Sequence, residues 1–175
     1  PAGNVTGSQL AKMLLVAIGY DADIENFTGN SWDTNVNVIA TQKGLYKGLE
    51  GMDVSAAVTR DQAAQMVWNA MQAGMVTYKY TLVSVNGELV SKVELVDKTD
   101  NNGDKVTLLN DKYNAEKIEG NLVDSKLQLT GTRAGTYTIS IDTDNDYTSD
   151  QTVVAVANDY SALLGQKVNV LYKDS

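Results

Sequence analysis

Residues 58–66, Val-Thr-Arg-Asp-Gln-Ala-Ala-Gln-Met, are the stretch that decides how the first half of this chain folds. A threonine followed three residues later by a glutamine has the spacing of a capping box, in which each side chain accepts a hydrogen bond from the other residue's main-chain amide. Thr59 and Gln62 therefore predict the start of a helix, with Val58 placed as a hydrophobic staple before it. The same pattern of valine, threonine, glutamine, alanine and methionine occurs at residues 5–13.

Three helices are expected in residues 1–75, because apolar residues recur there at helical spacing and a glycine follows each run. The expected apolar faces are Leu10, Met13, Leu14, Ala17 and Ile18 before Gly19; Trp32, Val36, Ile39 and Ala40 before Gly44; and Ala63, Met66, Val67, Ala70 and Met71 before Gly74. We expect the methionine and tryptophan side chains to pack in a core.

Residues 76–175 change to alternating apolar and polar positions, and we place the boundary at about Gly74–Tyr78. This alternation predicts strands, in which the residues that alternate with polar neighbours are Val93 and Leu95; Leu127 and Leu129; Tyr137, Ile139 and Ile141; and Val168, Val170 and Tyr172. The predicted fold class is α+β, with a helical repeat bundle at residues 1–75 followed by a small antiparallel β barrel or sandwich at residues 76–175.

Turn signals divide the second part. Asn86-Gly87 lies between two alternating runs and predicts a hairpin, because both central residues of that turn need a positive φ. Residues 101–104, Asn-Asn-Gly-Asp, predict a second hairpin tip. A short helix is expected at about Asn158–Leu164, ending at Gly165 before the last strand.

The helical part resembles the S-layer homology (SLH) repeat. An aromatic-led helix at Phe27 and Trp32, a glycine-bounded loop at Gly44–Gly48 and the helix start at residues 58–66 follow the order of that repeat. Residues 27–72 thus resemble one complete repeat. Residues 5–20 resemble the closing helix of a preceding repeat, so we expect the chain to begin inside a repeat and its β-rich domain to be incomplete.

SLH repeats attach bacterial surface proteins to secondary cell-wall polysaccharides, which often carry pyruvylated sugars. The resemblance implies that Arg60 grips the acidic sugar, and a guanidinium at a helix N-terminus suits a carboxylate. It further implies that Trp32 forms an apolar wall, and that Lys47 lines the groove together with Gly44 and Gly48. The implied protein is a non-enzymatic, extracellular component of a Gram-positive cell wall or S-layer.

Two departures from the family pattern leave an alternative open. The position of Arg60 is occupied by Gly7 in the first copy, so that copy lacks the gripping cation. Only about one and a half repeats are present, so a full set of inter-repeat grooves cannot form within this chain. The alternative is a self-assembly unit of a lattice or fibre, in which the helical part packs against other copies of the protein and binds no sugar.

A cluster of carboxylates supports a third interpretation, a calcium-dependent adhesion module. Asp142, Asp144, Asp146 and Asp150 occupy positions 1, 3, 5 and 9 of an EF-hand-like loop, the oxygen pattern that Ca²⁺ favours. Position 6 is Tyr147 and position 12 is Val153. We therefore expect the sharp turn and the bidentate ligand of a true EF-hand to be missing.

The composition excludes several classes of function. The 175 residues include no cysteine and no histidine, which excludes disulfides, thiolate or imidazole metal sites and a Ser-His-Asp triad. With 14 basic and 22 acidic residues the formal net charge is −8, which disfavours nucleic-acid binding. No apolar run approaches the ~20 residues that span a bilayer. No catalytic pair or phosphate-binding glycine loop stands out, so we expect no enzyme and no cofactor besides Ca²⁺.

Overall fold

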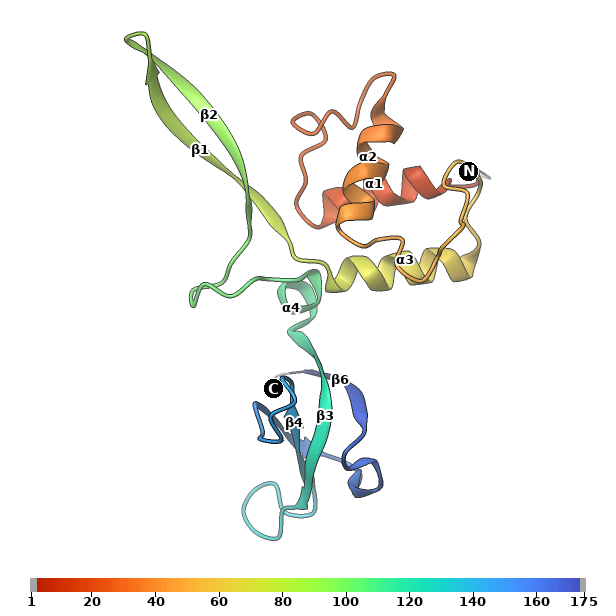
Figure 1. Ribbon diagram of the computed structural model, residues 1–175, viewed down its shortest axis with the longest axis vertical. Helices are drawn as coiled ribbons and strands as arrows, with labels where there is room; N and C mark the ends of the chain where they lie inside the picture. The colour runs from red at the N-terminus through yellow and green to blue at the C-terminus, as the bar shows by residue number, and fades with distance from the viewer. Residues whose placement is uncertain (1–2, 174–175) are drawn as a thin grey trace. The chain divides into compact units, whose positions relative to one another are not determined.

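The computed structural model describes residues 3–173, which form an α+β fold with four α-helices and two antiparallel sheets (Figure 1). The α+β part of the predicted fold class is thereby confirmed. The chain divides into two compact units, Pro1–Tyr113 and Asn114–Ser175. None of the helices among residues 3–173 is long and apolar enough to cross a membrane.

The first unit contains the three expected helices, a two-stranded sheet and a short fourth helix. These elements are α1 (Gly7–Ala17), α2 (Trp32–Gln42), α3 (Arg60–Gln72), β1 (Val76–Val85), β2 (Glu88–Asp97) and α4 (Leu108–Tyr113). Gly19, which follows α1, has a φ of 112°. A Cβ at this position would lie 2.1 Å from the carbonyl oxygen of Val76, so both the backbone angle and the close approach of β1 require glycine.

Both predicted capping boxes are present. The hydroxyls of Thr6 and Thr59 accept from the amides of Gln9 and Gln62 at 3.3 and 3.1 Å. The glutamine side chains accept in return from the threonine amides at 3.0 and 2.9 Å. The local sequence therefore fixes where α1 and α3 begin, since these contacts satisfy amides that would otherwise have no partner at a helix start.

The buried residues of α2 and α3 lie on the predicted faces, although Val67 of α3 is 40% exposed, whereas the buried face of α1 differs from the prediction. Val36 and Ala40 of α2 and Met66 and Ala70 of α3 are buried as predicted. In α1 the buried positions are Gly7, Ser8, Ala11 and Leu15, and of the predicted residues Ile18, which directly follows the helix, is buried. Met13, expected in the core, is 53% exposed, and Trp68 of α3, also expected in a core, is 37% exposed.

The main chain before α3 explains why α1 buries a different face from the predicted one. The amides of Gly7 and Ser8 donate to the carbonyls of Ala56 and Val54 at 3.2 and 2.8 Å. A Cβ on Gly7 would lie 2.8 Å from the Cα of Val54, so only glycine fits there. The small residues of α1 therefore face inward, because they admit a neighbouring backbone that a methionine would block.

A chain of side-chain hydrogen bonds joins four segments of this unit. The Tyr46 hydroxyl donates to Asn37 Oδ1 at 2.6 Å, Asn37 Nδ2 donates to Ser8 Oγ at 2.9 Å, and Ser8 Oγ donates to the Val54 carbonyl at 3.1 Å. Burial raises the pKa of Tyr46 to about 12, so its hydroxyl remains a hydrogen-bond donor at neutral pH. Asn37 is the middle link, because its amide is both acceptor and donor.

The compact units divide after residue 113, beyond the Gly74–Tyr78 boundary where helices give way to strands. Met75 and Val76 are buried in the same core as Phe27 and Met66. The amide of Met75 donates to the carbonyl of Val106 at 2.8 Å. Residues 76–113 therefore belong with the helices, and the β1–β2 sheet is separate from the sheet of the second unit.

The turn predictions for the first unit are confirmed. In the β1–β2 hairpin Val85 pairs with Glu88, and the two residues between them, Asn86 and Gly87, have φ angles of 52° and 86°. Positive φ at both positions is the requirement of the predicted hairpin turn. The second predicted tip, residues 101–104, lies inside an isolated bridge between Thr99 and Lys105.

The second unit is a single antiparallel sheet that curls into a half-barrel. It contains β3 (Ala115–Leu127), β4 (Tyr137–Asp142), β5 (Gln151–Val156) and β6 (Lys167–Lys173) in the order β5-β4-β3-β6. Within the described part of the chain β5 and β6 each pair on one side only, so the expected barrel is only half formed. Two finer predictions were wrong, because Leu129 lies outside β3 and the expected helix is only a 3₁₀ turn at Ser161–Leu163.

The core of the half-barrel consists of the inward residues of the alternating strands. Ile118, Leu122, Ile139, Ile141 and Val153 are buried, and Val168, Val170 and Tyr172 pack against them, as the alternation predicted for β4 and β6. A Cβ on Gly120 would lie 2.2 Å from the carbonyl oxygen of Asp142. Glycine at this position therefore lets the end of β4 approach the middle of β3.

Replacing Asn37 with alanine is expected to destabilise the first unit by about 2 kcal/mol, because the Tyr46 and Ser8 hydroxyls both lose a partner. Both tryptophans of the chain lie in this unit. Urea unfolding followed by tryptophan fluorescence therefore measures its stability directly.

The matched control is Asn35→Ala in the same helix. Asn35 Nδ2 makes one exposed hydrogen bond, to the Asn26 carbonyl at 3.0 Å, so its loss should cost well under half as much. Equal losses of stability in the two variants would show that the hydrogen bonds joining Tyr46, Asn37, Ser8 and Val54 contribute no more than an exposed hydrogen bond does.

Candidate functional site

Arg60, the predicted sugar-gripping cation, is the first residue of α3 and is exposed. Its side chain forms no hydrogen bond or ion pair with any residue between 3 and 173. It lies beside the α3 N-terminus, where the capping box of Thr59 and Gln62 already supplies partners for two amides.

The predicted loop Gly44–Gly48 contacts α3 through its main chain. Asn69 Nδ2 donates to the carbonyl of Leu45 at 3.0 Å and to that of Lys47 at 2.8 Å. The Lys47 side chain is exposed. This loop contacts the middle of α3, whereas Arg60 begins that helix.

Trp32, the fifth predicted residue, is half-buried and lines a separate pocket of about 550 Å³. We call it the Trp32 pocket; it is lined by Val5, Gln9, Lys12, Met13, Phe27, Thr28, Gly29 and Trp32. It lies between α1 and the segment that leads into α2. Gly44, Lys47, Gly48 and Arg60 do not line it, so the structure does not bring the five predicted residues together in one pocket.

Lys12 is the residue of this pocket that the sequence reasoning missed. Its ammonium lies 5.6 Å from the centroid of the Trp32 ring and donates to the Phe27 carbonyl at 2.6 Å. The first distance is within the range of a cation–π interaction. No pattern in the sequence marks Lys12, because the corresponding residue of the second copy is Gln65.

The electrostatics of the Trp32 pocket oppose those of the chain as a whole. The formal net charge of the protein is −8. Lys12 is nevertheless the one charged side chain among the residues that line this pocket, and no carboxylate is among them. A carboxylate ligand would therefore meet a cation without an acidic neighbour lining the same cavity.

The start of α1 is closed to an anion by the protein's own main chain. At this position the resemblance to SLH repeats calls for an arginine, and the chain has Gly7. The carbonyls of Ala56 and Val54 accept from the Gly7 and Ser8 amides, so the amides that could bind an anion are occupied. The available positive charge lies farther along the helix, at Lys12.

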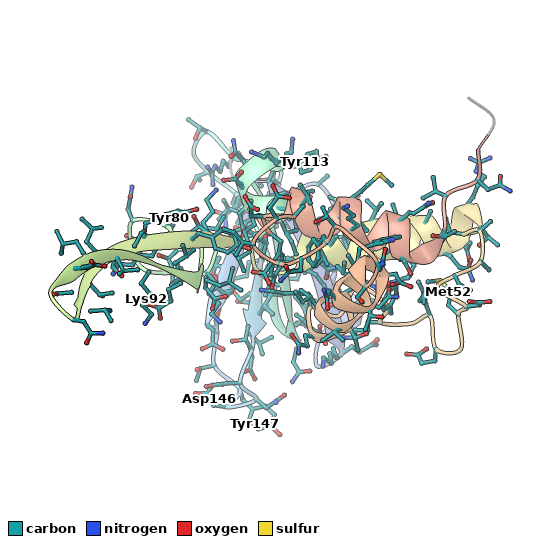
Figure 2. The ribbon with its side chains drawn as sticks, turned by 90° about the horizontal axis from the view of Figure 1, so that it is seen from above. Met52, Tyr80, Lys92, Tyr113, Asp146 and Tyr147 are labelled. Carbon is teal, nitrogen blue, oxygen red and sulfur yellow. The ribbon has the colours of Figure 1, made fainter. Side chains whose placement is uncertain are left out.

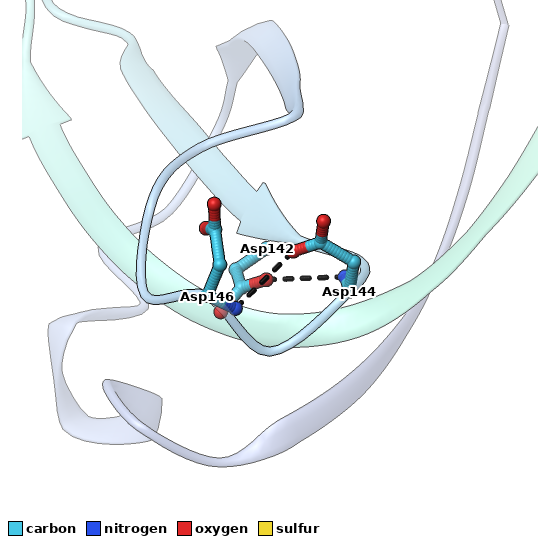
Figure 3. Close-up of side chains that lie close together, drawn as sticks. All are labelled: Asp142, Asp144 and Asp146. Atoms are coloured by element: carbon cyan, nitrogen blue, oxygen red, sulfur yellow. Dashed lines mark hydrogen bonds between the residues drawn. The ribbon is translucent and has the colours of Figure 1, made fainter.

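The predicted acidic loop, Asp142–Asp150, brings three of its four carboxylates together (Figure 3). Oxygens of Asp142, Asp144 and Asp146 lie within 4.8 Å of one another. Asp142 is fully buried, and its carboxylate accepts from the amides of Asp144, Asn145 and Tyr147 at 3.2, 2.7 and 2.9 Å. Asp142 is thus the centre around which the loop folds.

The fourth carboxylate of the loop has a different role. Asp150 Oδ2 accepts from the amide and the hydroxyl of Thr143, both at 2.7 Å, and these bonds lower the pKa of Asp150. Although the Asp146 amide donates to Asp144 and acts to lower its pKa, some loss of hydration and the charges of the other three carboxylates raise the pKa of Asp144 overall. A cation in the loop would relieve that repulsion.

The turn of the acidic loop forms without the glycine that an EF-hand uses. Tyr147 has a φ of 68°, in the left-handed region that glycine adopts most easily. The expectation that Tyr147 removes the sharp turn was therefore wrong, and the Asp142 carboxylate helps to hold this backbone through the Tyr147 amide. Val153 is buried in the half-barrel core and supplies no bidentate ligand, as expected.

A second cavity, of about 680 Å³, follows the concave face of the half-barrel. Its lining is polar and apolar in about equal parts and comes mainly from β5 and β6, with the inward residues Leu122 and Ile139. Among the residues that the structure describes, the charged ones that line it are Arg133 and Lys173. Sequence reasoning did not anticipate this cavity, because it left open whether the strands form a barrel or a sandwich.

No protein-family model, curated protein or solved structure matches this chain. The resemblance to SLH repeats thus rests on the residues quoted for it.

Proposed function

We propose that this protein is a non-enzymatic component of a bacterial cell surface, and that its first unit binds an acidic secondary cell-wall polysaccharide in the Trp32 pocket. The observation that carries the proposal is the Lys12 ammonium held 5.6 Å from the Trp32 ring centroid at the edge of an open pocket. An aromatic ring offers a surface for the apolar face of a sugar. The ammonium offers a partner for the carboxylate of a pyruvylated or uronic sugar.

A second lysine of the same unit shows how the Trp32 pocket differs from an ordinary packing contact. Lys43 lies 5.7 Å from the centroid of Tyr20 and donates to the carbonyl of Gly74 at 3.1 Å, so it repeats the arrangement of Lys12. Tyr20, however, is only 6% exposed, which leaves no ring surface for a ligand. Trp32 is half-buried and lines a cavity, and this difference favours a binding role for Lys12.

The proposal assigns Arg60 and Lys47 a supporting role. Both cations are exposed, lie outside the Trp32 pocket and can contact further acidic sugars of a long polymer. Exposed ion pairs of this kind contribute little individually. The affinity should therefore depend mainly on the pocket, where the charge of Lys12 is half-buried and has a fixed position.

Replacing Lys12 with methionine keeps an apolar stem of similar length and removes the charge. We expect this variant to bind purified, pyruvylated Gram-positive wall polymer at least about tenfold more weakly than the wild type, a loss of about 1.4 kcal/mol. Sedimentation of the protein with the insoluble polymer over a concentration series measures the affinity. Polymer stripped of its pyruvyl groups should bind the wild type about as weakly as intact polymer binds the variant.

The matched control is Lys47→Met, which removes an exposed charge of the same unit outside the pocket. Its affinity should stay within about twofold of the wild type. A large loss for Lys47→Met or Arg60→Gln, with none for Lys12→Met, would place the site on α3 and its loop. Absence of binding by the wild type would contradict the proposal altogether.

A second candidate function, calcium-dependent stabilisation of the second unit, is favoured by the clustered carboxylates of the acidic loop. The fit is partial, because Asp142, Asp144 and Asp146 supply three carboxylates where Ca²⁺ takes six to eight oxygens. Main-chain carbonyls or water would have to supply the rest. In this role Ca²⁺ would cross-link the loop that joins β4 to β5.

Calcium at about 5 mM is then expected to raise the melting temperature of the second unit by about 5 °C. Calorimetry measures this rise, and tryptophan fluorescence identifies the transition of the first unit. Asp144→Asn should abolish the rise, whereas Asp124→Asn, an equal change of charge elsewhere in the unit, should retain it. An unchanged melting temperature in the wild type would exclude this function.

A further inference from the structure

The β1–β2 hairpin has one apolar face and one charged face. Its register pairs Val76 with Asp97 and continues without interruption to the turn, so alternate residues of each strand share a face. One face carries Tyr80, Leu82, Leu89, Val93 and Leu95, which we call the apolar hairpin face. The opposite face carries the charged residues Lys79, Glu88, Lys92 and Glu94, together with Val83, Val85 and Val90.

The apolar hairpin face is open to solvent. Tyr80, Leu82 and Leu89 are 64%, 72% and 74% exposed, and Val93 and Leu95 are also exposed. Figure 2 shows Tyr80 and Lys92 on opposite sides of the hairpin. No third strand pairs with β1 or β2 among residues 3–173. The side of the hairpin that is open to solvent therefore consists of apolar side chains, which water solvates poorly.

Only the base of the hairpin is tied to the rest of its unit. Val76 is buried, and the Tyr78 hydroxyl donates to Glu25 at 2.7 Å and accepts from the Asp21 amide at 3.1 Å. Beyond Tyr78 the same face continues toward the turn without a partner. An isolated two-stranded hairpin is marginally stable in water and needs further strands or a packing surface.

The area and charge of the apolar hairpin face fit a second copy of the same face. The exposed side chains amount to roughly 500 Å² per copy, so two stacked hairpins would bury roughly 1,000 Å², near the lower limit for a specific interface. Between residues 78 and 95 this face carries no charged side chain. Two copies of an acidic protein can therefore meet there without burying or opposing charges.

We propose that two copies of this protein associate through the apolar hairpin face, with the hairpins stacked face to face. In this arrangement Leu82 and Leu89 of both copies form the centre of a small two-layered core. The charged face, with Lys79 and Glu94, stays in water on the outside. A charged partner would gain nothing from this uncharged surface. The association does not depend on polysaccharide binding, because the Trp32 pocket shares no residue with this face.

Sedimentation equilibrium of the full chain at about 10 to 500 µM tests this proposal, since an interface of about 1,000 Å² is expected to be weak. The wild-type mass should rise with concentration from that of a monomer toward that of a dimer. The double variant Leu82→Lys/Leu89→Lys would place charges in the interface and should remain monomeric throughout. Leu82→Thr/Leu89→Thr keeps strand-forming residues and should raise the dissociation constant at least about tenfold.

The matched control is Val85→Lys/Val90→Lys, the same change of charge on the opposite face of the same two strands. It should dimerise like the wild type. A wild type that stays monomeric at the highest concentration would overturn the proposal and direct the search to a different protein as the occupant. Equal loss of dimer in the control would overturn the assignment to this face.

Discussion

The hydrogen bonds that join Tyr46, Asn37, Ser8 and Val54 are the constraint on which the first unit depends. They connect α1, α2, the loop after α2 and the loop before α3. These four segments are distant in the sequence, so no local contact brings them together. With Val54 held against α1, position 7 must be glycine and the small residues of α1 must face inward. Lys12 then lies over Trp32, so the geometry of the pocket follows from this connection.

Sequence reasoning succeeded where short-range chemistry decides the structure. The capping boxes of Thr6 and Thr59 and the Asn86-Gly87 turn depend on a few neighbouring residues, so their spacing was sufficient. It failed where the structure depends on contacts with main chain that is distant in the sequence. The inward face of α1 depends on residues 54–57, and Tyr147 keeps a positive φ because the Asp142 carboxylate holds its amide. The position of Lys12 over Trp32 depends on how α1 packs near α2, which apolar spacing does not encode.

Although the net charge of the protein is negative, three of its surfaces differ from one another in charge. The Trp32 pocket has a single cation, the acidic loop concentrates carboxylates, and the apolar hairpin face carries no charge. Each suits a different partner, namely an acidic sugar, a cation and a second copy of the chain. A cell-surface component that holds a wall polymer and associates with itself would use the first and third together. The Cys-free composition is compatible with such a protein, whose stability then comes from packing and strand pairing.

The most direct test of the central claim is an NMR titration of the ¹⁵N-labelled protein with soluble fragments of acidic wall polysaccharide. The indole N–H signals of Trp32 and Trp68 report on two sites in the same unit, and Trp68 does not line the Trp32 pocket. The account predicts saturable shifts of the Trp32 indole and of the Thr28 and Gly29 amides, with the Trp68 indole unchanged. Shifts confined to Trp68 and the Arg60 end of α3, or no shifts at all, would contradict it.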